Sequence, residues 1–280
     1  MLGRLRVAAL LTWPALALVV LVAIPVVLLL RISLAPPDPN GLWSAGATLD
    51  AYRGLMDRSF AAALLYSLGL ALLVAAAGVG LGFPLTFFIT RMRRGWQVLW
   101  LVFLLTTLTL SDVLIAFSWQ VMLSKRIGLP TMLVNLGLMD QADSLTPSGG
   151  AVLANLIYLV LPFTVLMLYP TMSQLAPELL EAARTLGASP FVAFRAVVVP
   201  ATKRSAALAF VISAVLTLGA YVAPVVLGRP RQWTLAVLIS NAALAGHNIP
   251  RAAAMSVCLL LAALLLTGGT IWIARRRGAR

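Results

Sequence analysis

Three side chains of this sequence are candidates for contact with a polar solute inside an apolar environment. Asp112 is the one ionisable residue within the long apolar stretches, and Trp119 and Tyr221 also lie in such stretches. Burial of a charge in such a segment is costly, so Asp112 is a functional candidate. A carboxylate would suit a cation, and aromatic rings can stack on an ammonium group. Two alternatives remain open: Ser111-Asp112 can begin a broken helix, and the two rings can be ordinary packing residues.

Patterns for catalysis or metal binding are absent from the sequence. The chain has one Cys and one His, with no His/Cys/carboxylate cluster at ligand spacing and no nucleophile–base pair. Gly78, Gly80 and Gly82 form a Gly-x-Gly-x-Gly run inside an Ala- and Leu-rich stretch with no strand before it. That context indicates close helix packing rather than a dinucleotide-binding loop. We therefore expect no enzyme activity, no metal and no cofactor.

The elements that must position these residues are membrane spans. Hydrophobic residues make up 61% of the chain and charged residues only 10%, with a mean hydropathy of +1.00. Soluble domains carry about 25% charged residues, so the composition predicts an integral membrane protein. Six stretches approach or exceed the length of about 20 apolar residues that a spanning helix needs. Within a single transmembrane domain over residues 1–280, the predicted spans are 7–30, 61–89, 96–123, 151–169, 205–227 and 252–274.

The positions of Lys and Arg beside the spans predict the orientation. Of the 21 Lys and Arg residues, 13 fall on the side that includes both termini and 8 on the other. The tight turn with Arg91, Arg93 and Arg94, between the second and third predicted spans, is the strongest local signal. We therefore predict that both termini are cytoplasmic. The net charge of +13 then reflects membrane topology rather than binding to nucleic acid.

A polar cytoplasmic loop over residues 171–203 carries helix signals of its own. Apolar residues recur at three-to-four spacing before Gly187, which can end a helix with positive φ. Ser189-Pro190 can begin a second helix, with Ser as N-cap and Pro at the first position, and Pro200 would end it. Such a hairpin can lie on the membrane surface or dock on a protein. Its mixed charges and small Ala side chains favour docking.

Seven residues of this loop share a distinctive spacing. They are Glu181, Ala182, Ala183, Gly187, Val197, Val199 and Pro200. Together they resemble the EAA loop of the permeases of ABC importers, which more often have Ile and Leu at the two Val positions. Segments 117–123 and 218–228 are similar to spermidine/putrescine-type members. Many of those members have an acidic residue where this chain has Ala220, and often Thr where it has Ala223.

The resemblance implies the type I ABC importer permease fold. This fold is an all-α polytopic membrane protein with six transmembrane helices, both termini in the cytoplasm and a cytoplasmic coupling-helix hairpin. The hairpin would occupy a groove of a separate ATPase, and the permease itself would bind no ATP. Glu181 would face basic groups of the ATPase, Ala182 and Ala183 would allow close approach, and Gly187 would make the turn.

The resemblance also implies partners, a location and a substrate class. Two copies of a cytoplasmic ATP-binding subunit, a second permease expected to be homologous, and an extracytoplasmic solute-binding protein would complete an importer in the lipid of the bacterial inner membrane. The permease would form half of the path for a small polar solute, with a polyamine or related cation favoured; relatives carry amino-acid derivatives, opines or phosphonates. The alternative is an ion-coupled secondary transporter or channel, but such proteins usually have several ionisable groups within the membrane.

Overall fold

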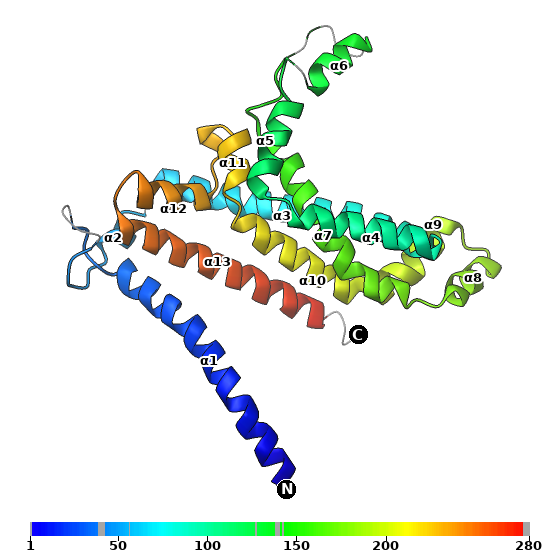
Figure 1. Cartoon of the computed structure of the whole chain (residues 1–280), viewed down its shortest axis with the longest axis horizontal. Coiled ribbons are helices and arrows are strands. Elements are labelled where there is room, and N and C mark those ends of the chain that lie inside the picture. Colours follow the sequence, from blue (N-terminus) through cyan, green and yellow to red (C-terminus); the bar gives the residue numbers. More distant parts are fainter. Residues whose placement is uncertain are drawn as a thin grey trace. The chain divides into compact units, whose positions relative to one another are not determined.

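The computed structural model describes a chain built of helices. The described residues are 2–38, 43–55, 57–126, 128–137, 141 and 143–276. Within those ranges there is no strand (Figure 1), in agreement with the predicted all-α class. Arg277 and Arg280, which contributed to the predicted orientation, lie outside the described residues. The chain forms two compact units: residues up to Ala61 with Leu238–Leu261, and Ala62–Val237 with the residues from Ala262 onward.

The helices follow one another along the chain with short connections in most places. They are α1 Leu2–Ser33, α2 Asp50–Arg53, α3 Arg58–Arg91, α4 Arg94–Thr109, α5 Asp112–Met122, α6 Leu129–Asn135, α7 Gly149–Ser173, α8 Pro177–Thr185, α9 Pro190–Ala193, the π-helical η1 Phe194–Val198, α10 Val199–Leu218, α11 Val222–Leu227, the 3-10 turn η2 Pro230–Gln232, α12 Leu235–Leu244 and α13 Ile249–Arg276. The short helix α12 was not predicted from the sequence.

Five of these helical segments are long and apolar enough to cross a membrane. They are Leu16–Ser33 of α1, all of α3, all of α7, the continuous stretch Pro190–Leu218, and Ile249–Thr270 of α13. The pair α4 and α5 passes the same test only when its two helices are taken together, and it is bent by 99°. The described chain therefore has five such spans, or six if the bent pair is one span.

The bend lies within the predicted span 96–123 and agrees with the alternative that Ser111-Asp112 begins a broken helix. Leu110 and Ser111 are extended, with ψ of 142° and 132°, so α4 ends before them and α5 begins after them. The hydroxyls of Thr106, Thr107 and Thr109 each donate to a carbonyl three or four residues back, at 2.6–2.8 Å. Back-bonding of this kind weakens and bends helices, and three such hydroxyls fall in the last turn of α4.

The fifth predicted span is also broken, and Pro224 explains where. Helix α10 ends at Leu218 and α11 begins at Val222, so the break precedes Pro224 rather than falling on it. Pro224 lies in the first turn of α11, where a missing N–H costs nothing. In a continuous helix its ring would clash with the carbonyl of Ala220. That carbonyl instead accepts a hydrogen bond of 2.9 Å from the Thr234 hydroxyl.

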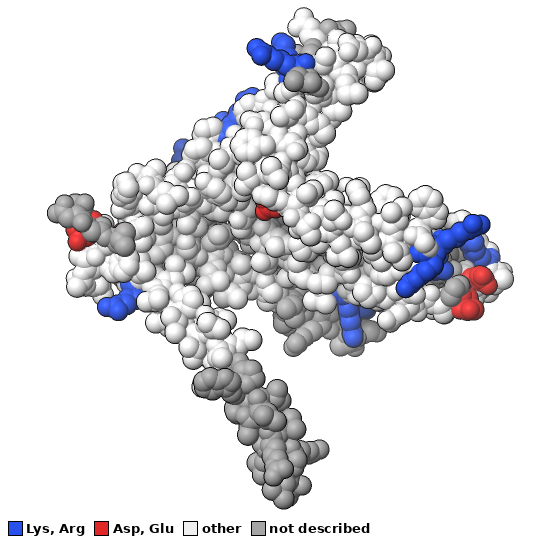
Figure 2. Space-filling view, in the orientation of Figure 1, with Lys and Arg blue, Asp and Glu red and all other residues white. Residues whose placement is uncertain are grey.

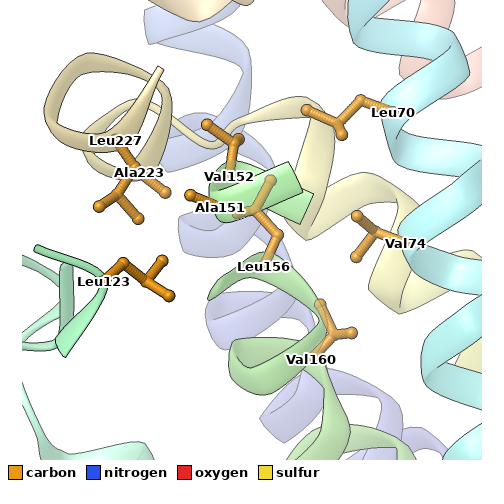
Figure 3. Close-up of a cluster of buried hydrophobic side chains, with 9 residues drawn as sticks. All are labelled: Leu70, Val74, Leu123, Ala151, Val152, Leu156, Val160, Ala223 and Leu227. Atoms are coloured by element: carbon orange, nitrogen blue, oxygen red, sulfur yellow. The ribbon is translucent and has the colours of Figure 1, made fainter. Parts of the chain in front are cut away.

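The core of the second unit is centred on α7. Figure 3 shows its side chains between those of α3 and those of α11. The cluster consists of Leu70 and Val74 from α3, Leu123 after α5, Ala151, Val152, Leu156 and Val160 from α7, and Ala223 and Leu227 from α11. Helix α7 also packs along α10, where the hydroxyls of Thr171 and Ser205 lie 2.6 Å apart.

Glycines allow α3 to approach α7 closely. A Cβ at Gly78 would lie 2.7 Å from Cγ2 of Val160, and one at Gly82 would lie 2.6 Å from Cγ2 of Thr164. Gly80 faces away, with no atom within 4 Å of a Cβ there. The prediction of close helix packing is therefore confirmed for two of the three glycines, and α7 is the helix they contact.

This contact yields a matched pair of variants. Gly82→Leu should lower the free energy of unfolding by about 1–3 kcal/mol or more, because the side chain has no space against α7. Gly80→Leu should leave it unchanged or slightly higher, since Leu favours helix over Gly. Thermal unfolding of the two purified proteins in detergent measures the difference. Equal melting temperatures would contradict the close packing of α3 on α7.

Candidate functional site

The loop between α7 and α10 forms a helical hairpin whose turn is made by Gly187. This residue has φ of +86°, a conformation that costs little only for glycine. Its N–H donates to the carbonyl of Arg184 at 2.9 Å, and the N–H of Ala188 donates to that of Ala183 at 3.1 Å. These two bonds are the Schellman arrangement that closes a helix end. The predicted end of the first hairpin helix at Gly187 is therefore confirmed.

The second arm of the hairpin begins as predicted but does not end as predicted. The hydroxyl of Ser189 accepts a hydrogen bond from the N–H of Val192, and Pro190 occupies the first turn. The prediction that Pro200 ends this helix is wrong, because the chain remains helical from Pro190 to Leu218. The π-helical turn η1 directly precedes α10, which has Pro200 in its first turn. Residues pair five apart in a π-turn, so the helix continues without the bond that Pro200 cannot make.

The outer surface of the hairpin combines apolar and charged side chains. Leu186 is 88% exposed and Phe191 is 71% exposed, on either side of the turn. Glu181 and Ala182 are exposed, and Ala183 is half-buried. Figure 2 shows basic (blue) and acidic (red) side chains gathered at the end of the second unit that carries α8 and α9. Large apolar side chains that flank a turn and are ringed by charges of both signs suit a protein contact better than a lipid surface.

The remaining residues of the EAA-like pattern lie where the hairpin joins α10. Val199 and Pro200 occupy the first turn of α10 and are exposed. Val197 lies in η1 and is half-buried. The structure thus brings Glu181, Ala182 and Gly187 together in the hairpin, with Val199 and Pro200 at its base.

Aromatic contacts anchor the base of the hairpin to α3. The ring of Phe194 in η1 packs edge-on against Phe83 at 5.6 Å and Phe87 at 5.0 Å, measured between ring centroids. The guanidinium of Arg91 lies 5.4 Å from the centroid of Phe87. Beneath these rings, Leu168, Met172 and Val198 form a buried apolar cluster. Sequence reasoning did not identify this anchor, although two Phe residues four apart on α3 mark one helix face.

The second candidate site is a cavity of about 310 Å³ where two broken helices meet α7. Its walls include Leu110 and Asp112 at the α4–α5 break, and Gly219 to Tyr221 at the α10–α11 break. Helices α5 and α11, which follow the two breaks, pack side by side (Figure 1). Non-helical backbone at membrane depth is tolerated where it is buried in protein or lines a cavity, and both breaks meet this condition.

Two of the three predicted path residues line this cavity. Asp112 and Tyr221 are both in its wall. Trp119 is not among the lining residues; its ring packs edge-on against Tyr158, with centroids 6.0 Å apart, and Tyr158 does line the cavity. The alternative that Asp112 begins a broken helix is also correct, since it is the first residue of α5. Asp112 therefore both begins helix α5 and lines the cavity.

Asn155 is the cavity residue that sequence reasoning missed. It projects from α7, is fully buried, and lines the cavity. Neither its Oδ1 nor its Nδ2 has a hydrogen-bond partner among the described residues. Asn155 is the one amide in the fourth predicted span, but the search for buried charge considered only ionisable side chains. Among the described residues that line the cavity, Asp112 is the one charged side chain, and none is Lys or Arg.

Comparison with known proteins assigns the chain to a family of transport proteins. Residues 127–278 match the family described as "Binding-protein-dependent transport system inner membrane component". The match covers more than half of the chain, and the chain belongs to this family. It is therefore a multi-pass protein of the bacterial inner membrane and a permease subunit of a transport system, not itself an enzyme.

The similar curated proteins include polyamine permeases. The chain is 26% identical over 264 residues to the spermidine/putrescine transport system permease protein PotB of Haemophilus influenzae, covering 94% of this chain and 91% of that one. It is 31% identical over 185 residues to PotB of Escherichia coli, covering 66% and 67%. Identity to the inner membrane ABC transporter permease protein YdcU of Escherichia coli is 28% over 232 residues, covering 78% and 74%.

Two solved transporters share the fold. A chain of a bacterial ABC transporter that imports the acidic polysaccharide alginate superposes with a TM-score of 0.79 at 17% identity, covering 98% of this chain and 96% of that one. A chain of the inward-facing methionine transporter MetNI gives a TM-score of 0.58 at 17% identity, covering 76% and 94%. The predicted fold class of an ABC importer permease is thereby confirmed.

The aromatic anchor yields a second pair of variants. Phe194→Ala should lower the free energy of unfolding by about 2 kcal/mol or more, because two ring contacts and partly buried area are lost. Phe191→Ala should change it by no more than about 0.5 kcal/mol, since the Phe191 side chain is exposed. Thermal unfolding in detergent distinguishes the two. A Phe194→Ala variant as stable as Phe191→Ala would show that the hairpin is not held through this ring.

Proposed function

We propose that this permease carries a polyamine or a related small cation, as one transmembrane subunit of a binding-protein-dependent ABC importer. The observation that carries the proposal is the cavity between the broken helices, whose one charged side chain is the carboxylate of Asp112. The similarity to PotB permeases over most of the chain supports the same substrate class. The substrate path includes Asp112 and Tyr221 in the wall, with Trp119 supporting the wall through Tyr158.

The electrostatics of the cavity favour a cation. Helices α4 and α10 end at the cavity and helices α5 and α11 begin there, so the opposite partial charges of their ends offset one another. The carboxylate of Asp112 is therefore what makes the wall negative. Ala220, where similar polyamine permeases often have an acidic residue, lies in the same wall. In this chain Asp112 supplies the wall with a carboxylate that Ala220 does not. The aromatic ring of Tyr221 adds a face on which an ammonium group can stack.

The hairpin is the docking element for the ATPase. On the cytoplasmic side, with both termini, it inserts Leu186 and Phe191 into an apolar groove of an ATP-binding subunit. Glu181 faces basic groups there, and Ala182 and Ala183 permit close approach. The permease binds no ATP, and hydrolysis takes place on the partner.

One helix connects the hairpin to the cavity. Helix α10 has Val199 and Pro200 in its first turn and ends at Leu218, next to Thr217 in the cavity wall. At 1.5 Å per residue its 20 residues span about 30 Å. Phe194 couples the same hairpin to α3. A displacement of the hairpin by the ATPase therefore moves α10 and α3 together and alters the cavity at the far end of α10.

The complete importer needs further chains. A second, homologous permease supplies the other half of the path, two ATP-binding subunits dock on the two hairpins, and an extracytoplasmic binding protein delivers the solute. The single transmembrane domain spans the membrane six times, with the bent pair α4–α5 as one span. Lipid surrounds it, and nucleic acid has no role.

Reconstitution tests the proposed function directly. Gentle extraction of the permease should co-purify an ATP-binding subunit, and proteoliposomes of the assembly should take up radiolabelled spermidine or putrescine only with ATP and loaded binding protein. The control is the same assembly with ADP in place of ATP. Uptake driven by an ion gradient without ATP would instead support a secondary transporter.

The turn of the hairpin offers a test of coupling. Gly187→Asp places a side chain and a charge at φ of +86° in the ATPase contact, so uptake per ATP hydrolysed should fall by roughly tenfold, or ~1.4 kcal/mol. Gly137→Asp is the matched control, because Gly137 also has positive φ, of +71°, but lies after α6. Uptake and ATP hydrolysis are measured in proteoliposomes at equal protein levels. Wild-type uptake by Gly187→Asp would refute the coupling role of the hairpin.

A further inference from the structure

We infer that Asn155 binds the ammonium group of the solute in the cavity, as a second polar contact beside Asp112. This inference rests on the proposed function and names a specificity-determining residue for it. The ligand class is an aliphatic amine: an ammonium head held by the two oxygen-bearing side chains, and a methylene chain against the apolar wall.

The first argument is the cost of burying an unpaired amide. Asn155 is 0% exposed, and both Oδ1 and Nδ2 lack a partner among the described residues. A buried polar group that forms no hydrogen bond is costly, and such groups in native proteins are nearly always paired. Because Asn155 has no surface open to water in this conformation, a group entering the cavity completes its hydrogen bonds once the neighbouring wall side chains move aside.

The second argument is that Asn155 differs from the other buried polar residues around it. In the second unit each of the others forms at least one side-chain hydrogen bond: Ser67, Thr86, Thr164, Thr202, Ser213, Thr217 and Thr234. Ser and Thr hydroxyls satisfy themselves on carbonyls of their own helix. Among these buried residues, Asn155 alone retains both a donor and an acceptor for a ligand.

The third argument is the chemistry of the wall that Asn155 shares. Asp112 lies in the same wall, and no Lys or Arg side chain does. The oxygen of an amide and a carboxylate together can accept two of the three N–H donors of a primary ammonium group. Leu156, Val160 and Phe163 line the cavity as well, and these apolar side chains suit methylene groups. An anionic solute would find no positive side chain there.

Two substitutions of Asn155 test the inference. Asn155→Leu keeps the same number of side-chain heavy atoms and removes both the donor and the acceptor, so the initial rate of spermidine uptake by the complete importer should fall by about tenfold or more. Asn155→Asp retains an acceptor and should keep uptake within about threefold of wild type. The control is Thr164→Val, which removes another buried polar group of α7 that does not line the cavity and should leave the rate near wild type.

The second readout separates binding from assembly. ATP hydrolysis stimulated by spermidine-loaded binding protein should stay within about twofold for Asn155→Leu, because docking and the hairpin are intact. In a double-mutant cycle, Asn155→Leu combined with Asp112→Asn should be less than additive, since both residues contact one group. If the Asn155→Leu permease itself does not fold, the Asn155→Asp uptake rate and its cycle with Asp112→Asn carry the test.

Three results would overturn the inference. Near-normal spermidine uptake by Asn155→Leu would show that no solute contact is lost. Uptake by Asn155→Asp as low as by Asn155→Leu would exclude the acceptor role. Loss of the second permease from purified Asn155→Leu would show that Asn155 pairs with that chain instead. Failure of the proposed function is distinct, because the wild-type importer itself would then take up no polyamine.

Discussion

The structure depends on the requirement that backbone groups inside a membrane be hydrogen-bonded within the protein. An unpaired N–H or C=O costs several kcal/mol in hydrocarbon, so a broken helix is tolerated only where protein or a cavity meets its ends. Both breaks, at Leu110–Ser111 and at Gly219–Tyr221, lie against one cavity. At the second break, the carbonyl that Pro224 displaces from helical bonding is taken by the hydroxyl of Thr234. Because both interruptions lie beside the same cavity, the backbone groups that lack helical partners in the two spans gather in its wall.

The same requirement bears on how the hairpin is connected to the cavity. A helix with all its internal bonds is stiff, and α10 is such a helix between the base of the hairpin and the cavity. The π-helical turn η1 lets the helix pass Pro200 without a break. Because Phe194 in that turn packs between Phe83 and Phe87, the hairpin is also joined to α3. Rigid connection at the base and interrupted helices at the cavity suit a permease that is moved by a partner.

Much of this arrangement could be predicted from the sequence because its causes are local. The Schellman end at Gly187 follows from glycine's tolerance of positive φ, and the start at Ser189-Pro190 follows from capping. The bend after Thr109 is harder to predict, because its local signs, the Thr hydroxyls and the Ser111-Asp112 pair, are compatible with both a broken and a continuous span. Two features depend on which helices pack together: the contacts of the Phe194 ring with α3, and the lack of a hydrogen-bond partner for the amide of Asn155 among the described residues. The spacing of apolar residues within one segment does not predict which distant segment it will contact.

The polarity of the cavity is consistent with transit rather than storage. A path must bind a solute well enough for it to enter and weakly enough for it to leave. A largely apolar wall with one carboxylate and one amide provides few strong contacts; Asp112 lies at the α4–α5 break, whereas Asn155 lies on the continuous helix α7. The first turn of α5 favours the negative charge of Asp112, which offsets part of the cost of placing a carboxylate there. Movement of α10 would then alter the wall that faces these two groups without unfolding any helix.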